Sequence, residues 1–353
     1  MTFFMMNAKI QIIIMVVVVL LTGCGGSNHS KSTVSKKNDV KDARVTIDQF
    51  IKNAGLMFKN DSTPPKDINE LLEIIKSDNV SRYKAAQKYA STLNGADGLY
   101  IRSMLDLSWA GIQQITAKVL KERANKKLAE SNRLDAMEKS GAELSDEESA
   151  KKADLEARAE KLVIVSHALQ TVMDVNITSG ESLANEMVRQ FPENPGGFVL
   201  RAYANRLKGA WSVFTGAIKT AERLEKKENQ NIRYQRIMEK LQRFRLKNEA
   251  RTELEAFRDE LPDWVRAQAI LTAIADSTES SHKELERLRA VSPHHIVVQL
   301  LGKIIDDEYA VYKSLNPQSQ VDTGLDSEQP AQADTDTSLD SEADTATDSS
   351  SEN

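Results

Sequence analysis

The chain has 353 residues, of which 40% are hydrophobic and 5% aromatic, and its formal net charge is −5. Ala, Leu, Glu, Lys and Arg are prominent, and such a composition favours α-helices. Cys24 is the one cysteine, which excludes an internal disulfide and a metal site built from several thiolates, so stability must come from an apolar core.

The first segment has the pattern of a secretory leader. Ile10 to Leu21 form a twelve-residue stretch that is apolar except for Gln11. A helix of this length is too short to span a bilayer. We therefore expect residues 1–23 to be a signal peptide that is removed from the mature protein.

Residues Leu21, Thr22, Gly23 and Cys24 resemble the bacterial lipobox at all four positions. The resemblance implies that the leader is cut before Cys24 and that this cysteine is acylated, which makes membrane lipid an expected partner. Several acyl chains hold a protein stably on a membrane, whereas one does so marginally. Gly25 replaces the aspartate that favours inner-membrane retention, which implies the outer membrane, facing the periplasm, if the organism is Gram-negative.

Two features of the leader leave alternatives open. Lys9 is its only charged residue, where a signal peptide usually has a basic cluster. Translation from Met6 rather than Met1 gives a more ordinary leader. An uncleaved N-terminal anchor is the alternative to cleavage.

Two polar segments flank the body of the chain. Residues 24–40 are poor in apolar side chains and are expected to be a flexible tether, and residues 317–353 an acidic disordered tail. The tail holds ten Asp and Glu and no Lys or Arg. Because the leader contributes only Lys9, residues 24–316 carry a net charge of +4.

Calcium binding is one interpretation of the tail. Asp334, Asp336 and Ser338 alternate as at the start of an EF-hand loop. However, Leu339 stands where that loop needs glycine, and Thr345 where it needs glutamate. The sequence therefore favours a solvating tail or a weak electrostatic arm.

The region 41–111 is expected to be helical. Helices are predicted over residues 42–59 and 67–76, the second with a capping box at its start. Ser81 can cap a further helix, and the dipeptide 94–95 ends it.

Residues 112–178 predict a long antiparallel helical hairpin. The turn is expected at Ser140-Gly141, and Ser145 with Glu148 has the spacing of a capping box that restarts the helix. Two interpretations remain, a pair of core helices or a docking arm that projects from the body. Apolar and small residues at heptad spacing follow on the return limb: Leu155, Ala159, Leu162, Ser166, Leu169 and Met173.

Residues 179–316 contain a pattern that resembles tetratricopeptide (TPR) repeats. The best unit shows Pro195, Phe198, Ala202, Gly209, Trp211, Ile218, Ala221 and Leu224. Weaker units are expected over residues 229–261 and 262–293, followed by a terminal helix with Ser292 as N-cap and Pro293 as first residue. An unclassified helical bundle is the alternative.

The TPR resemblance implies a concave binding surface formed by first-helix residues. In this chain, these are Val199, Tyr203 and Arg206. Tyr203 as a core residue and Arg206 as a solvated surface charge are the alternatives.

The sequence offers no set of catalytic residues. No HExxH, GxSxG or phosphate-binding loop motif is present, and His294-His295 needs further ligands to bind a metal. We therefore expect no cofactor, no metal and no enzymatic activity. Nucleic acid is not an expected partner, because glutamates interrupt the basic cluster of Arg233, Arg236, Lys240, Arg243, Arg245, Lys247 and Arg251. That cluster is expected to be a solvated helix face or a site for an acidic segment.

The expected protein is an all-α, lipid-anchored scaffold that binds another cell-envelope protein through a helical-repeat surface. One alternative is an accessory binding component of a periplasmic solute transport system. An envelope enzyme is a further alternative.

Overall fold

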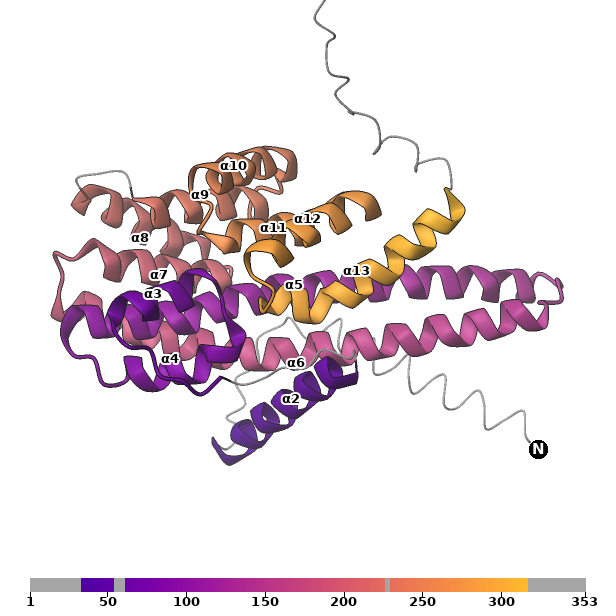
Figure 1. Cartoon of the computed structure of the whole chain (residues 1–353), viewed down its shortest axis with the longest axis horizontal. Helices are drawn as coiled ribbons and strands as arrows, with labels where there is room; N and C mark the ends of the chain where they lie inside the picture. The colour runs from indigo at the N-terminus through magenta and orange to yellow at the C-terminus, as the bar shows by residue number, and fades with distance from the viewer. Residues whose placement is uncertain (1–32, 54–60, 226–228, 317–353) are drawn as a thin grey trace, which may run out of the picture. The chain divides into compact units, whose positions relative to one another are not determined.

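The computed structural model describes residues 33–53, 61–225 and 229–316 (Figure 1). The chain divides into two compact units, residues 1–312 and residues 313–353. Over the described ranges the fold is all-α, with twelve α-helices named α2 to α13 and no strand, which confirms the predicted fold class. None of these helices combines the length and apolar character that crossing a membrane requires.

The longest helices, α5 (Gly95–Lys139) and α6 (Asp146–Gln190), form an antiparallel hairpin (Figure 1). They are joined by the predicted turn, in which Gly141 has a φ of +91°. Ser145 Oγ accepts the N–H of Glu148 at 3.2 Å, and Glu148 Oε2 accepts the N–H of Ser145 at 2.8 Å. The predicted capping box is therefore confirmed.

The hairpin is longer than the predicted range 112–178. The start of α5 and the end of α6 share a core with α3, α4 and α7. The buried residues in these two segments therefore do not follow the heptad spacing of a simple two-helix hairpin. The predicted heptad residues of α6 are buried, except for Met173, which is half-buried.

Buried polar groups join the two long helices. Ser166 Oγ donates to the backbone carbonyl of Ala117 at 2.8 Å, and Asn176 Nδ2 donates to Gln113 Oε1 at 3.1 Å. Because a register slip leaves such buried groups without partners, these bonds fix the alignment of α5 and α6.

Helix α2 (Thr33–Asn53) packs on α6 through Ala43 and Ile47. It begins at Thr33, so its first residues overlap residues 33–40 of the predicted tether. Val40 continues the apolar face of Ala43 and Ile47 at helical spacing. The remainder of the predicted tether, the leader and the acidic tail lie outside the described residues.

Helix α3 (Ile68–Lys76) begins where the sequence predicts it. Asp67 Oδ1 accepts the N–H of Glu70 at 2.9 Å, as an N-cap should. In a capping box, the Glu70 carboxylate would also accept the N–H of Asp67. Here Glu70 Oε2 accepts the N–H of Lys66 instead, so the predicted capping box is only half formed.

Helix α4 (Tyr83–Ala90) has a different start from the predicted one. A 3₁₀ turn over Val80–Arg82 precedes it, and Arg82 occupies the N-cap position. Ser81 Oγ donates to Asn79 Oδ1 at 2.7 Å, so the prediction of Ser81 as the helix cap is wrong.

Three helix pairs follow the hairpin. They are α7 (Pro195–Leu207) with α8 (Trp211–Leu224), α9 (Gln230–Gln242) with α10 (Lys247–Glu260), and α11 (Val265–Ile274) with α12 (Thr278–Val291). Pro195 is the first residue of α7, and Gly209 has a φ of +73° in the α7–α8 turn, at the two positions that the repeat pattern predicts.

Helix α13 (Ile296–Leu315) starts later than predicted. Ser292 is not its N-cap but ends α12, and its hydroxyl donates to the backbone carbonyl of Ser77 at 3.0 Å. Arg123 of α5 pairs with Glu308 of α13, with Nε 3.1 Å from a carboxylate oxygen. This ion pair joins α13 to the long hairpin.

Candidate functional site

The predicted lipidation motif lies outside the described residues. Leu21, Thr22, Gly23 and Cys24 therefore have no structural account, and their role in export and acylation stays a prediction. The predicted binding surface and the charged clusters do fall in the described part of the chain.

The three residues predicted to line a concave surface are buried. Val199 and Tyr203 are each 1% exposed and Arg206 is 2% exposed, so their assignment to a binding surface is wrong. The alternative of Arg206 as a solvated charge is also wrong, whereas Tyr203 is a core residue.

Different neighbours bury these residues. Tyr203 shares a core with α5, which packs against α7, whereas Val199 lies in a cluster with α8 and α9. Gln114 of α5 donates to the carbonyl of Leu207, at the end of α7, at 2.9 Å and accepts a hydrogen bond from Gln242 of α9 at 3.1 Å. A Cβ on Gly111 of α5 would lie 2.5 Å from Tyr203 Oη. Helix α5 thus covers the side of α7 on which Tyr203 lies.

Arg206 has hydrogen-bond partners that are all neutral. Its Nε donates to Gln235 Oε1 at 2.6 Å and its Nη1 to Gln242 Oε1 at 2.7 Å, while its guanidinium lies 4.8 Å from the Tyr203 ring centroid. Burial lowers the pKa of Arg206 from its usual value. Arg206 therefore links α7 to α9 as part of the core.

The basic cluster joins neighbouring helices. Arg236 of α9 pairs with Glu222 of α8 at 3.0 Å, and Arg251 of α10 lies 3.1 Å from Asp276, just beyond α11. Ion pairs with carboxylates hold six of its seven side chains: Arg233, Arg236, Lys240, Arg243, Lys247 and Arg251. Only Arg236, Lys247 and Arg251 reach a carboxylate outside the α9–α10 pair, and all six side chains are already neutralised.

The two adjacent histidines do not converge. His294 is exposed, whereas His295 is fully buried, with its Nε2 3.5 Å from Asp78 Oδ2. His295 Nδ1 accepts the N–H of Val297 at 3.1 Å. Asp78 forms a buried ion pair with Arg266, so His295 belongs to a structural network between α3, α11 and α13.

A cavity beside this network is lined partly by Asp78, Ser108 and Trp109. It has room for about one water molecule. That size does not suit an organic solute.

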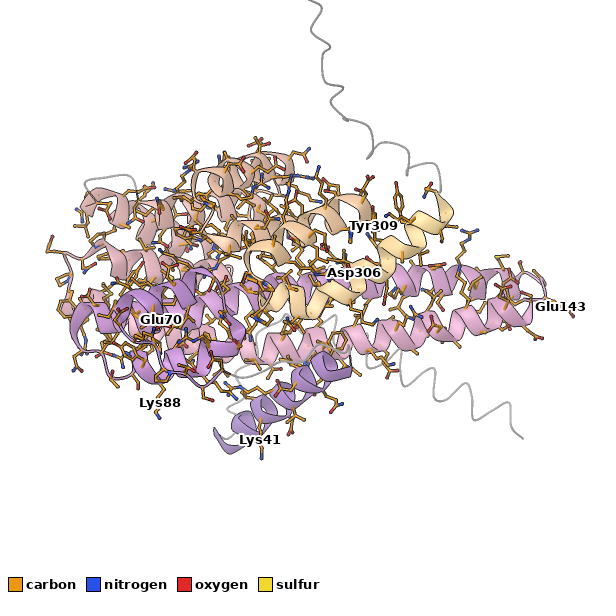
Figure 2. All side chains as sticks on the ribbon, viewed as in Figure 1. Lys41, Glu70, Lys88, Glu143, Asp306 and Tyr309 are labelled. Carbon is orange, nitrogen blue, oxygen red and sulfur yellow. The ribbon has the colours of Figure 1, made fainter. Side chains whose placement is uncertain are left out.

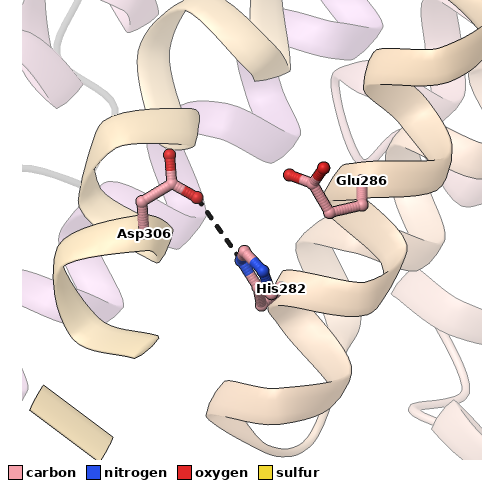
Figure 3. A group of neighbouring side chains, drawn as sticks. All are labelled: His282, Glu286 and Asp306. Atoms are coloured by element: carbon pink, nitrogen blue, oxygen red, sulfur yellow. Dashed lines mark ion pairs between the residues drawn. The ribbon is translucent and has the colours of Figure 1, made fainter. Parts of the chain in front are cut away.

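A metal-ligating set forms between α12 and α13. His282 and Glu286 are one helical turn apart on α12, and Asp306 faces them from α13 (Figure 3). His282 Nδ1 lies 3.4 Å from Asp306 Oδ1, and one ligand atom from each residue lies within 4.8 Å of the others. This arrangement can hold a cation.

Arg289 and Tyr309 surround this set. Arg289 Nη1 lies 2.5 Å from Glu286 Oε1, and its Nη2 lies 2.6 Å from Asp306 Oδ2. Hydrogen bonding to Asp306 raises the pKa of Arg289 above its usual value. The Tyr309 ring, on α13 with Asp306 (Figure 2), stacks on the His282 ring with centroids 3.9 Å apart.

An aromatic patch, formed by Trp211, Arg243, Phe244 and Leu246, lies at the start of α8 and in the α9–α10 turn. Phe244 is 53% exposed and Leu246 is 41% exposed. The Arg243 guanidinium lies 4.9 Å from the Phe244 ring centroid and 5.9 Å from that of Trp211. This surface is suited to contact with another protein.

Sequence reasoning missed both the metal-ligating set and the aromatic patch. The His282 and Glu286 spacing was a usable signal, because residues four apart share a helix face. Asp306 gave no such signal, since its approach depends on how α13 packs. No family model, curated protein or solved structure matches this chain.

Proposed function

We propose that this protein is a lipid-anchored scaffold of the bacterial cell envelope that binds another envelope protein. The lipobox resemblance at Cys24 supports the anchor and a cell-envelope location, which is the outer membrane facing the periplasm if the organism is Gram-negative. The aromatic patch is the single observation that supports binding.

The patch has the residue types that contribute most to protein interfaces. Tryptophan and arginine are enriched among residues whose truncation weakens binding by large amounts, and phenylalanine is enriched in interfaces. Exposed Phe244 and Leu246 gain apolar burial when a partner covers them. Arg243 contacts both aromatic rings and also pairs with Glu239 at 2.8 Å, so its position is set before binding.

Site-specific photo-crosslinking in intact cells tests the proposal. A photoreactive amino acid at position 246 should give a discrete crosslinked product with one envelope protein. A matched probe at position 164 uses Ile164 of α6, which is 50% exposed and distant in sequence from the patch. That control should not give the product.

Two variants show whether the product reflects binding. Phe244→Ala should weaken the crosslink at position 246 because it removes apolar contact area, and Cys24→Ala should weaken it because the protein leaves the membrane. An equal product from position 164, or a product at position 246 that Phe244→Ala leaves unchanged, contradicts binding by the aromatic patch.

A further inference from the structure

We infer that His282, Glu286 and Asp306 form a binding site for a divalent transition-metal ion of the Zn²⁺ class, which enters by displacing the guanidinium of Arg289. The site lies between α12 and α13 and shares no residue with the aromatic patch. It therefore stands independently of the proposed scaffold function.

The ligand atoms are close to the spacing that zinc requires. Bonds of about 2.0–2.1 Å at tetrahedral angles hold neighbouring ligand atoms about 3.3–3.4 Å apart. His282 Nδ1 and Asp306 Oδ1 are already 3.4 Å apart. Glu286 completes the set within 4.8 Å, and its side chain is 54% exposed, so a rotamer change can bring its carboxylate closer.

His282 has a nitrogen that a metal can use. Its Nδ1 is buried and has no hydrogen-bond partner, since the approach of Asp306 lacks hydrogen-bond geometry. The ring stacks on Tyr309 with an interplanar angle of 15°, which restricts its rotation. In the tautomer with its proton on Nε2, the imidazole offers the Nδ1 lone pair to an ion.

The two carboxylates of the set already bind a cationic side chain, that of Arg289. Glu286 and Asp306 supply two carboxylates, and Arg289 contacts both of them with a single positive charge. A divalent ion places more charge at the same point and can also bond to His282 Nδ1, to which Arg289 donates no hydrogen bond. The Arg289 side chain is 31% exposed, so it can swing into solvent when the ion enters.

One imidazole and two carboxylates define the class of ion. Zn²⁺ accepts nitrogen and carboxylate ligands and commonly takes three protein ligands with a water molecule in the fourth position. Mg²⁺ prefers octahedral oxygen coordination and retains several waters. The set therefore selects Zn²⁺ over Mg²⁺.

Isothermal titration of the full chain with Zn²⁺, and separately with Mg²⁺, tests this assignment. Wild-type protein should bind one Zn²⁺ at this site and show a Zn²⁺-dependent rise in Tm, with no comparable response to Mg²⁺. His282→Gln should weaken Zn²⁺ binding at least about tenfold, as expected for loss of a metal ligand. Arg289→Gln should tighten it severalfold, because the competing cation is gone.

Two matched controls separate this site from general metal binding. His294→Gln removes an exposed histidine, and Asp307→Asn removes an exposed carboxylate beside Asp306 that pairs with Lys303. Neither should change Zn²⁺ affinity. Circular dichroism identifies any variant that fails to fold, and Asp306→Asn then replaces His282→Gln as the variant that lacks a ligand.

The outcomes are distinct. Weaker Zn²⁺ binding by His282→Gln together with tighter binding by Arg289→Gln supports a metal site that the Arg289 guanidinium occupies when no ion is bound. Absence of a Zn²⁺ response in both wild type and Arg289→Gln overturns the inference and leaves an interhelical ion-pair network. Equal affinity in wild type and His282→Gln also overturns it, because the ion then binds elsewhere.

Discussion

Arg266 and Asp78, which are 188 residues apart in the chain, form a buried two-pronged ion pair. The Nη2–Oδ1 distance is 2.8 Å and the Nε–Oδ2 distance is 3.0 Å, with side chains that are 4% and 3% exposed. Arg266 also donates to the carbonyl of Ile75 at 3.3 Å. The pair thus fastens the end of α3 to α11.

Breaking this pair should be strongly destabilising. Arg266→Ala leaves Asp78 buried without its cation, and we expect the free energy of unfolding to fall by about 3–5 kcal/mol. Urea denaturation followed by circular dichroism measures the loss. The double variant Arg266→Met with Asp78→Leu removes both charges and should recover part of it. A loss below about 1 kcal/mol for Arg266→Ala contradicts this account.

Asp78 should make stability fall in acid. Burial raises the pKa of Asp78, but Arg266 and the neighbouring His295 outweigh burial and hold it below the usual 3.8. A depressed carboxyl pKa stabilises the folded state above the unfolded-state value and loses that contribution as pH falls through the folded-state value. The stability advantage of wild type over Asp78→Asn should therefore shrink below about pH 4. Urea denaturation between pH 3 and pH 7 measures it, and an advantage independent of pH contradicts the assignment.

Asp106 should make the folded state less stable as pH rises, which is opposite to the effect of Asp78. Burial raises the pKa of Asp106, and hydrogen bonds from Ser179, Gln87 and Tyr83 only partly offset this. A raised carboxyl pKa means that the folded state binds the proton more tightly, so stability declines as pH rises through that value.

Asp106→Asn should therefore gain stability relative to wild type as pH rises from 4 to 7. The amide can keep hydrogen bonds to Ser179 and Tyr83 without burying a charge. Thermal unfolding of both proteins across this range measures the difference. A wild-type advantage that grows toward pH 7 contradicts the prediction.

The close approach of α5 and α7 gives a prediction about Gly111 and Tyr203. Gly111→Ala places a Cβ 2.5 Å from Tyr203 Oη, and we expect it to destabilise the fold by about 1–3 kcal/mol. Tyr203→Phe removes that hydroxyl, which is buried without a hydrogen-bond partner, and should by itself be nearly neutral.

The double variant decides whether the clash is specific. In Gly111→Ala with Tyr203→Phe, the nearest ring atom is 3.3 Å from the new Cβ, so most of the loss should be recovered. A double-mutant cycle from urea denaturation measures this coupling. Additive losses contradict the packing of α5 against the first helix of the array.

Local sequence signals predicted much of the fold. Ser145 with Glu148 identified the start of α6, and Pro195 and Gly209 identified two boundaries in the first helix pair. These signals act within a few residues, where capping and backbone preferences determine the conformation.

Long-range packing could not be predicted in this way. The burial of Tyr203 depends on α5, and that of Val199 and Arg206 depends on α8 and α9. No local sequence pattern indicates which of these helices pack together. Asp306 likewise joins His282 only because α13 lies beside α12. The candidate site therefore required the tertiary structure.

Membrane fractionation of cells with wild type or Cys24→Ala tests the anchored scaffold most directly. Cys24→Ala removes the thiol that the lipobox resemblance assigns to acylation, and its helical body should still fold. Wild type should incorporate labelled palmitate and sediment with membranes, whereas Cys24→Ala should incorporate none and remain in the periplasmic fraction. A Cys24→Ala protein that folds and still sediments with membranes as wild type does would contradict the lipid anchor.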